Sequence, residues 1–361
     1  MRIVAKIGTA SVTDDRGQIA PVAIATLVDE VAELRTAGHE VIVVSSGAVA
    51  AGVAALGMGD RPADMRTLQA VSAVGQARLV QAYDRELARH GLVGAQLLVD
   101  PYDFVERSQY LHLRATLDRL IELGTVPIVN ENDAIANDEL RYGDNDRIAA
   151  LLANSVKADV LVLLTDMDGL YTADPRHDAT AQLVPFVGVD DPLLAIAAGT
   201  SGSGRGSGGM ASKLTAARMA SWSGVRCVIG RATQPGILQG AVSDEMIGTT
   251  FAAHRRALSA RKLWIAFAAD VSGAVSVDAG ARRALVERPN SLLPAGVVQV
   301  TGSFEAGDVV ELVDPEGSSF ARGRVSVTAA SLRKVIGRQT SELPDGMTHE
   351  VVHRDDLVVL A

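Results

Sequence analysis

The fold of this chain can first be inferred from residues 126–133, Val-Pro-Ile-Val-Asn-Glu-Asn-Asp. Four apolar residues predict a short buried strand, and four polar residues follow them without a break. An Asx turn is one interpretation of the polar run. The alternative is that these side chains hydrogen-bond an ammonium group or a metal-bound water. The stretch therefore predicts a buried strand that carries polar groups to one edge of a sheet.

Short apolar runs alternate with longer helical patterns through roughly the first 250 residues. The predicted strands are 3–6, 41–44, 95–99, 126–129, 160–164 and 225–229. The predicted helices are 22–36, 65–87, 110–123, 147–156 and 210–221. This alternation indicates an α/β fold, a three-layer αβα sandwich with a mostly parallel central sheet. Such sheets bind ligands at the carboxyl ends of their strands.

The pattern changes after about residue 255. Short β-type runs at 275–277, 297–300, 309–312 and 325–327 are separated by turn signals. We therefore expect a catalytic α/β domain at 1–255, a linker at 256–274 and a small, mainly β domain at 275–361.

Composition limits the class of protein. The chain has 361 residues, 48% of them hydrophobic and 21% charged, which predicts a folded protein of about two domains. A net charge of −9 argues against a protein built mainly to bind nucleic acid or an anionic membrane. The single cysteine, Cys227, excludes an intrachain disulfide. No long apolar window and no signal-peptide pattern are present, so we expect a soluble cytoplasmic protein that does not enter membranes.

Two motifs follow the first two predicted strands. Lys6 ends the first strand and is a candidate phosphate ligand, with Gly8 allowing close approach of the backbone. The alternative for Lys6 is a lysine whose stem packs in a tight turn. The run Ser45–Ala48 suits an anion at a helix N-terminus, although an ordinary capping serine has the same pattern.

Two acidic motifs lie further along the chain. The run Gly143–Asp146 opens a helix with more acidic and amide groups than one cap needs, so these groups could bind a substrate amine or hold nearby lysines. The segment Leu164–Pro175 follows a strand and is long and polar, which suits a nucleotide base or ribose. A plain surface loop remains an alternative for the end of this segment.

The glycine- and serine-rich run Gly202–Gly209 leads directly into a predicted helix, with Lys213 in the first turn. A flexible linker is the alternative interpretation. Cations are disfavoured at a helix N-terminus, so Lys213 indicates a bound anion there. The run lacks the spacing of a Walker A loop.

Two lysines, a glycine-rich helix start and several acids at one sheet edge suit phosphoryl transfer, which depends on positioning and charge neutralisation. The sequence shows no Ser/His/Asp or Cys/His set. None of the seven histidines pairs with another at metal-ligand spacing, so no metal site made by protein side chains is expected.

Taken in order, these motifs resemble the amino acid kinase family, and within it the members that phosphorylate glutamate. The tail resembles the PUA domain that many of those enzymes carry. The resemblance rests on 6–9, 45–48, 73–76, 130–134, 143–146, 164–166 and 206–210, and in the tail on 291–296 and 351–356.

The resemblance implies transfer of phosphate from ATP, with Mg²⁺, to the side-chain carboxylate of L-glutamate, the first step of proline biosynthesis. It also implies feedback inhibition by proline and a homo-oligomer, a dimer or tetramer. Lys6 and Lys213 would neutralise the phosphoryl group, and Asp146 would orient them. The residues implied for glutamate are Ser46, Asp133 and Asn145. The residues implied for ATP are Lys6, Thr165, Asp166, Ser207, Gly208, Gly209, Met210, Ala211, Ser212 and Lys213.

Two rival functions follow from the same sequence. A related kinase could use acetylglutamate, aspartate, carbamate or a nucleotide as acceptor, although most of those lack an appended β domain. An RNA-binding protein is suggested by the tail, but residues 275–361 carry nine Lys and Arg against twelve Asp and Glu. An acidic module is a poor ligand for phosphate backbones, so a nucleic-acid partner is not expected.

Overall fold

The computed structural model describes residues 1–14, 16–135, 144–189, 191, 209–255, 257–288, 290–344 and 349–360. The chain divides into two compact units, Met1–Leu258 and Ser259–Ala361. Each unit has its own sheet and its own hydrophobic core.

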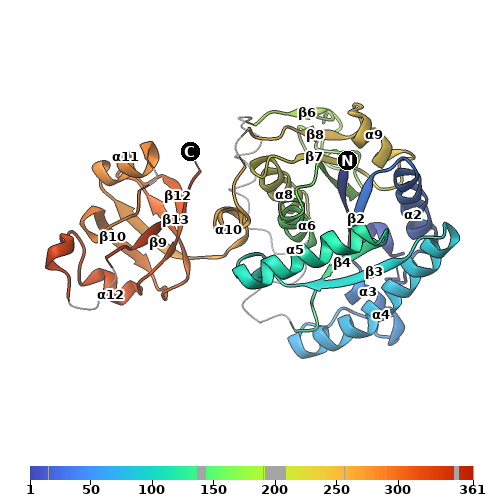
Figure 1. Cartoon of the computed structure of the whole chain (residues 1–361), viewed down its shortest axis with the longest axis horizontal. Coiled ribbons are helices and arrows are strands. Elements are labelled where there is room, and N and C mark those ends of the chain that lie inside the picture. Colours follow the sequence, from blue (N-terminus) through green and yellow to red (C-terminus); the bar gives the residue numbers. More distant parts are fainter. Residues whose placement is uncertain are drawn as a thin grey trace. The chain divides into compact units, whose positions relative to one another are not determined.

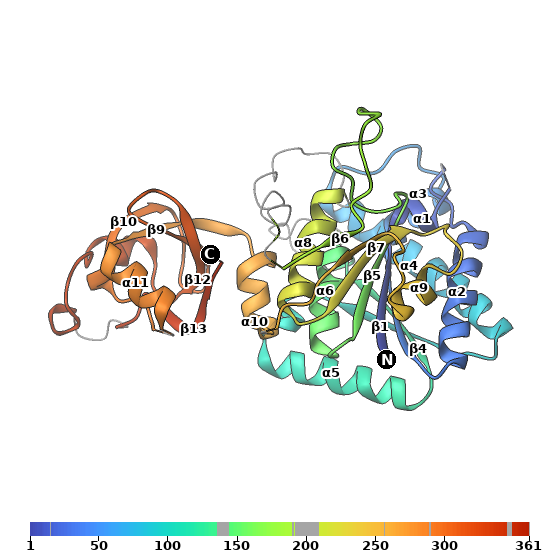
Figure 2. The same ribbon diagram turned by 90° about the horizontal axis from the view of Figure 1, so that it is seen from above.

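Within the described part of the first unit, eight strands form one sheet in the order β3-β4-β2-β1-β5-β7-β8-β6 (Figures 1 and 2). From β3 to β7 every neighbouring pair is parallel, whereas β8 runs antiparallel to β7. The strands are β1 (Arg2–Ile7), β2 (Glu40–Ser45), β3 (Gly94–Val99), β4 (Val126–Glu131), β5 (Val160–Thr165), β6 (Phe186–Val187), β7 (Arg226–Arg231) and β8 (Thr249–Phe251). The chain leaves β1 for β2 on one side and returns to β5 on the other. The carboxyl end of β1 is therefore the place where this topology forms a crevice.

Helices cover both faces of this sheet. The described helices of the unit are α1 (Thr9–Val12), α2 (Pro21–Thr36), α3 (Ala48–Ala55), α4 (Met65–Arg89), the 3-10 helix η1 (Pro101–Phe104), α5 (Arg107–Glu122), α6 (Asn145–Ser155), α8 (Met210–Trp222) and α9 (Ile237–Ser243). Helices α2, α4 and α9 share one core with alternate residues of the strands. Helices α5, α6 and α8 pack against strands of the same sheet and contribute further buried side chains. The result is the three-layer αβα sandwich that the sequence predicts.

Strand β1 decides where its lysine points. Ile3, Ala5 and Ile7 belong to the core that includes α2 residues. Because side chains alternate along a strand, Lys6 must face the opposite layer. Its ion-pair partner is indeed on α6. The period of two in this strand therefore directs the lysine toward α6 and α8.

Helices α3 and α4 cross at very close range because of a glycine. A Cβ atom at Gly75 would lie 1.8 Å from the carbonyl oxygen of Ala48 and 2.5 Å from the backbone nitrogen of Gly52. No side chain fits at such distances. At the other end of α3, Gly47 has a φ of 109°, which favours glycine, and it turns the chain from β2 into the helix. Both glycines thus fix α3 beside the carboxyl ends of β1 and β2.

The second unit contains a five-stranded sheet in the order β10-β9-β11-β12-β13 among its described residues. Its strands are β9 (Val271–Val277), β10 (Val297–Gly302), β11 (Val309–Val313), β12 (Ser319–Val325) and β13 (Val352–Val359). Its helices are α10 (Ala260–Leu263), the π-helix η2 (Trp264–Ala268), α11 (Ala279–Glu287), η3 (Pro294–Gly296), α12 (Ala329–Arg333) and η4 (Thr340–Glu342). All neighbouring pairs are antiparallel except β9 and β11.

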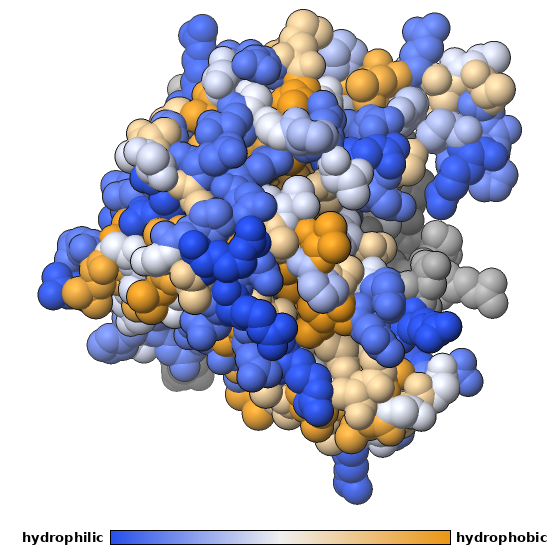
Figure 3. Space-filling view, turned by 90° about the vertical axis from the view of Figure 1, so that its right-hand side faces the viewer, coloured by the Kyte–Doolittle hydropathy of each residue, from blue (hydrophilic) through white to orange (hydrophobic). Residues whose placement is uncertain are grey.

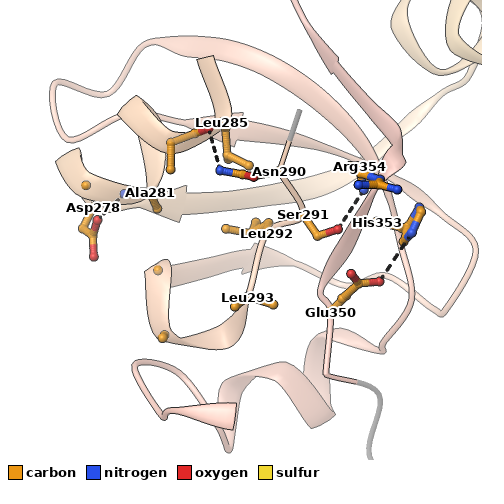
Figure 4. Close-up of a pocket in the computed structure, with 14 residues that line it drawn as sticks. Asp278, Ala281, Leu285, Asn290, Ser291, Leu292, Leu293, Glu350, His353 and Arg354 are labelled. Carbon is orange, nitrogen blue, oxygen red and sulfur yellow. Dashed lines mark hydrogen bonds and ion pairs between the residues drawn. The ribbon is translucent and has the colours of Figure 1, made fainter. Parts of the chain in front are cut away.

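A cavity of about 790 Å³ lies beside α11 and β13 in this unit (Figure 4). Several of its polar groups are engaged in holding the unit together. Asn290 donates to the carbonyl of Ala284, the hydroxyl of Ser291 accepts from the backbone N–H of Arg354, and Asp278 caps α11. The cavity is lined by neither lysine of the predicted phosphate site.

None of the helices in the described ranges is both long and apolar enough to cross a membrane. On the face drawn in Figure 3, hydrophilic and hydrophobic residues are interspersed.

The structure modifies some of the expected elements. Strand β4 continues through Asn130 and Glu131, so the polar run begins inside the strand. Residues 260–268, expected as a connector, form α10 and η2, and β9 begins at Val271. The expected strand at 325–327 is wrong because β12 ends at Val325. Strand β13 and helices α9, α11 and α12 were not predicted.

We predict that Gly75→Ala lowers the free energy of unfolding of the first unit by about 3 kcal/mol, because α4 must move away from α3. Thermal or urea denaturation checks this. Gly188→Ala is the control, since a Cβ there meets nothing within 4 Å. Equal stability of the two variants would contradict the close crossing.

Candidate active site

Two lysines meet one carboxylate in the interior of the first unit. Lys6 Nζ lies 2.6 Å from Asp146 Oδ1, and Lys213 Nζ lies 3.2 Å from Asp146 Oδ2. The exposed fractions of Lys6, Asp146 and Lys213 are 3%, 1% and 4%. Two ammonium groups around one carboxylate leave a net charge of +1 in a buried place. Such a charge is costly unless an anion is bound, so the cluster indicates an anion site.

The electrostatics of the cluster agree with this interpretation. Burial is the largest influence on the pKa of Lys6 and lowers it, while Asp146 opposes this fall and Lys213 adds to it. Burial alone would raise the pKa of Asp146, but the two lysines outweigh burial and hold that pKa below its usual range. Asp146 is therefore an anion that anchors both lysines, and it is unsuited to accept a proton in a reaction.

A second contact ties the starts of α6 and α8 together. Asp144 caps α6 through the backbone N–H of Arg147 and accepts a hydrogen bond of 2.6 Å from Ser212 Oγ. Burial raises the pKa of Asp144, whereas Arg147 and Ser212 oppose the rise. Because Lys213 follows Ser212 directly, this contact also fixes where Lys213 enters the site.

A cavity of about 720 Å³ opens above the two lysines. Lys6, Gly8 and Thr9 line it from the end of β1, Thr165 and Asp166 from the end of β5. The start of α8 contributes Gly209, Met210 and Lys213, and the segment after β5 contributes Leu170, Tyr171, Ala173, Asp174, Pro175 and Arg176. The size is that of a pocket for a nucleotide-sized ligand.

A smaller cavity of about 310 Å³ adjoins the first, since Thr9, Ser46 and Arg61 line both. Its other lining residues are Arg16, Gly17, Gly47, Ala48, Val49, Ala50, Val53, Gly59, Asn130, Asp133 and Asn145. The two cavities therefore form one site with a large and a small compartment.

Asp133 is the acidic group of the small compartment. Burial raises its pKa to about 6, although a hydrogen bond from Ser72 and the charge of Arg61 both act to lower it. Ser72 Oγ donates to Asp133 Oδ2 over 3.3 Å. Burial makes the charged form of this carboxylate costly, and a cationic ligand bound beside it would offset that cost. Asp133 is therefore suited to recognise a cationic group.

The structure brings most of the predicted site residues together. The two compartments are lined by Lys6, Ser46, Asp133, Asn145, Thr165, Asp166, Gly209, Met210 and Lys213. Asp146 lies behind both lysines. Ala211 and Ser212 belong to the first turn of α8 but line neither compartment. Ser207 and Gly208, like Gly143, lie outside the described residues.

Sequence reasoning did not single out Arg16, Arg61 or Arg176. Each resembles an ordinary surface residue in its local sequence, and only the fold places it at a compartment. Asn130 had a usable signal, since it opens the polar run after a buried strand.

Comparison with known protein families identifies the family of this chain. Residues 1–231 match the model of the amino acid kinase family, and residues 273–347 match that of the PUA domain. The chain therefore belongs to the amino acid kinase family. A crystal structure of T. acidophilum isopentenyl phosphate kinase aligns with a TM-score of 0.50 at 19% identity, covering 70% of this chain and 100% of that one. This likeness shows the fold alone.

Relatives that match over nearly their whole length identify the group within this family to which the chain is similar. Glutamate 5-kinase of Myxococcus xanthus is 46% identical over 364 residues, which cover 99% of this chain and 96% of that protein. Glutamate 5-kinase of Rhodococcus opacus is 47% identical over 358 residues, with the same coverage of each chain. These relatives place the chain among the glutamate 5-kinases of that family.

We predict that Asp133→Asn stabilises the protein at pH 8. An acid whose folded pKa is raised from 3.8 to about 6 destabilises the fold fully above pH 6 and not at all below its unfolded pKa. The gain in free energy of unfolding should reach up to about 3 kcal/mol at pH 8 and vanish toward pH 4. Urea denaturation at both pH values measures it. A destabilised variant at pH 8 would contradict the raised pKa.

Proposed function

We propose that this chain is a kinase that transfers the γ-phosphoryl group of ATP to the side-chain carboxylate of L-glutamate, giving ADP and L-glutamyl 5-phosphate, the first step of proline biosynthesis. The observation that carries the proposal is the buried cluster of Lys6, Asp146 and Lys213, whose two lysines line the large compartment. The kinship with glutamate 5-kinases over 99% of the chain supports the substrate.

The charges of the small compartment match those of glutamate. Glutamate carries two carboxylates and one ammonium group at neutral pH. The compartment offers two guanidinium groups, Arg16 and Arg61, and one carboxylate, Asp133. Its volume of about 310 Å³ suits a small amino acid. Asp133 would bind the ammonium group, and Ser46 and Asn145 would orient the chain of carbons that leads to the large compartment.

The reaction needs no general base. The side-chain carboxylate of glutamate has an ordinary pKa near 4.3, so its oxygen is already a nucleophile at pH 7. That oxygen forms a bond to the γ-phosphorus, and the bond from this phosphorus to the bridging oxygen of ADP breaks. The obstacle is repulsion between two anions. Lys6 and Lys213 reduce it, because each places an ammonium group where charge gathers.

The residues present fit ATP. The large compartment has the volume for a nucleotide, and Lys6, Lys213 and the backbone near Gly8 and Gly209 would hold the phosphates. Thr165 and Asp166, joined by a hydrogen bond of 2.9 Å, would face the nucleoside. Mg²⁺ bound to the nucleotide would supply further positive charge at the phosphate oxygens. The described residues contain no cluster of three or more His, Cys, Asp or Glu side chains that could hold a metal ion.

An assay of purified protein with ATP, Mg²⁺ and L-glutamate tests the function. Hydroxylamine traps an acyl phosphate as a hydroxamate, and ADP release is followed in parallel. Glutamate-dependent hydroxamate equal to the ADP formed is expected. Product with acetylglutamate or aspartate instead would keep the kinase and overturn the substrate, and no product with any acceptor would overturn the proposal.

We predict that Lys213→Ala lowers kcat by roughly a hundredfold or more, because one of the two ammonium groups at the phosphoryl group is lost. Lys334→Ala, on the surface of the second unit, is the control. Steady-state ADP release with saturating substrates measures both variants. Turnover of Lys213→Ala close to that of the control would contradict the role of this lysine.

Feedback inhibition by proline, a dimer or tetramer and a cytoplasmic location stay predictions. Proline added to the hydroxamate assay tests the first, and light scattering of the purified chain tests the second.

A further inference from the structure

The motif Ala73-Val74-Gly75-Gln76 has one residue whose purpose the site has not explained. Gly75 allows α3 and α4 to cross, and Gln76 is next to it on α4. Gln76 is only 7% exposed, and its Oε1 accepts a hydrogen bond of 2.7 Å from Asn130 Nδ2. Among the described residues its Nε2 has no partner. A buried amide whose N–H donor is unpaired is costly. We therefore infer that this position needs a glutamine for its accepting oxygen, Oε1.

Asn130 begins a chain of hydrogen bonds that ends at the junction of the two compartments. Asn145 Nδ2 donates to Asn130 Oδ1 over 2.9 Å and to Ser46 Oγ over 3.1 Å. Asn130 and Asn145 are 1% and 5% exposed. Ser46 lines both compartments. The chain therefore runs from Gln76, behind the site, to a hydroxyl inside it.

A backbone group fixes the direction of this chain. The N–H of Glu131 lies 2.9 Å from Asn130 Oδ1 and 3.2 Å from Asn145 Oδ1. Because a backbone N–H can only donate, both side-chain oxygens must face it. The nitrogen of Asn130 then points to Gln76, which has to accept, and the nitrogen of Asn145 points to Ser46. The Glu131 N–H therefore identifies which side-chain atom is oxygen and which is nitrogen in both asparagines.

The direction has a chemical consequence at Ser46. Its oxygen accepts from Asn145, so the hydroxyl hydrogen is left to donate to another group. No acceptor for that hydrogen is found among the described residues. In the proposed function, the group that the Ser46 hydroxyl would meet at the junction of the compartments is the reacting carboxylate of the substrate. A carboxylate can only accept hydrogen bonds.

We propose that Gln76 is a positioning residue for the acceptor substrate. By accepting from Asn130 it keeps Asn130 and Asn145 aligned, and this alignment leaves the Ser46 hydroxyl as a donor to the reacting carboxylate. The inference rests on the proposed function for the identity of that carboxylate. Without an acceptor at position 76, the buried Nδ2 of Asn130 loses its partner, the amide turns to find another, and Asn145 no longer holds Ser46.

The test compares Gln76→Leu, Gln76→Glu and Gln81→Leu with the wild type. Gln76→Glu keeps an accepting oxygen in either protonation state, and Gln81 is an exposed glutamine on the same helix. For Gln76→Leu we expect kcat/KM for glutamate to fall about tenfold or more with KM for ATP unchanged. Gln76→Glu and Gln81→Leu should stay within about threefold of the wild type.

A double variant strengthens the test. If Gln76 acts through Ser46, then Gln76→Leu should add little to the loss already caused by Ser46→Ala, whereas independent effects would multiply. Multiplying effects would overturn the proposal.

Three other outcomes would also overturn it: an unchanged kcat/KM for glutamate in folded Gln76→Leu, a KM for ATP raised as much as the KM for glutamate, or a Gln76→Glu variant as defective as Gln76→Leu. Thermal denaturation shows whether each variant folds. If Gln76→Leu does not fold, Gln76→Met takes its place, and failure of both variants while Gln76→Glu folds would assign the acceptor to stability and overturn the proposal. If the wild type uses another carboxylate acceptor, the proposed function fails alone, and the same variants are measured with that acceptor.

Discussion

Two buried ammonium groups sharing one buried carboxylate are the feature on which the site depends. Removing three charges from water is expensive, and one carboxylate cannot neutralise two lysines. In the proposed function an anion completes the cluster, and a triphosphate bound there would gain free energy from charges already fixed in place. Because Asp146 bonds to both lysines, neither has to search for its position when the substrate binds.

The fold brings together three residues that are far apart in sequence. Lys6 ends a central strand, Asp146 is in the first turn of α6 and Lys213 in the first turn of α8. A parallel sheet places the ends of β1 and β5 side by side, and two helices on one face then begin at the same edge. The small compartment lies at the same edge beside α3, and Gly47 and Gly75 fix the position of that helix. In the proposed function both substrates therefore meet at the carboxyl end of β1.

Local sequence was sufficient for the parts of this account that depend on strand ends. A lysine, a serine or a polar run after a buried apolar stretch predicted the edge where ligands bind, and the structure brings those residues together. Local sequence was insufficient for the end of β4. Asn130 and Glu131 are polar residues that are buried and hydrogen-bonded, so a prediction based on apolar residues ends the strand too early. The place of Arg61 was beyond its reach for a related reason. Contacts with residues distant in sequence bring Arg61 to the two compartments, and no periodicity records such contacts.

The central claim is that Asp146 serves the reaction by holding two lysines. The most direct measurement is kcat for glutamate-dependent ADP release by Asp146→Asn, with folding checked by thermal denaturation. The variant is matched in shape but lacks the charge that fixes Lys6 and Lys213. The account predicts a kcat lowered by roughly a hundredfold or more in a folded protein. A folded Asp146→Asn variant that turns over at close to the wild-type rate would contradict it.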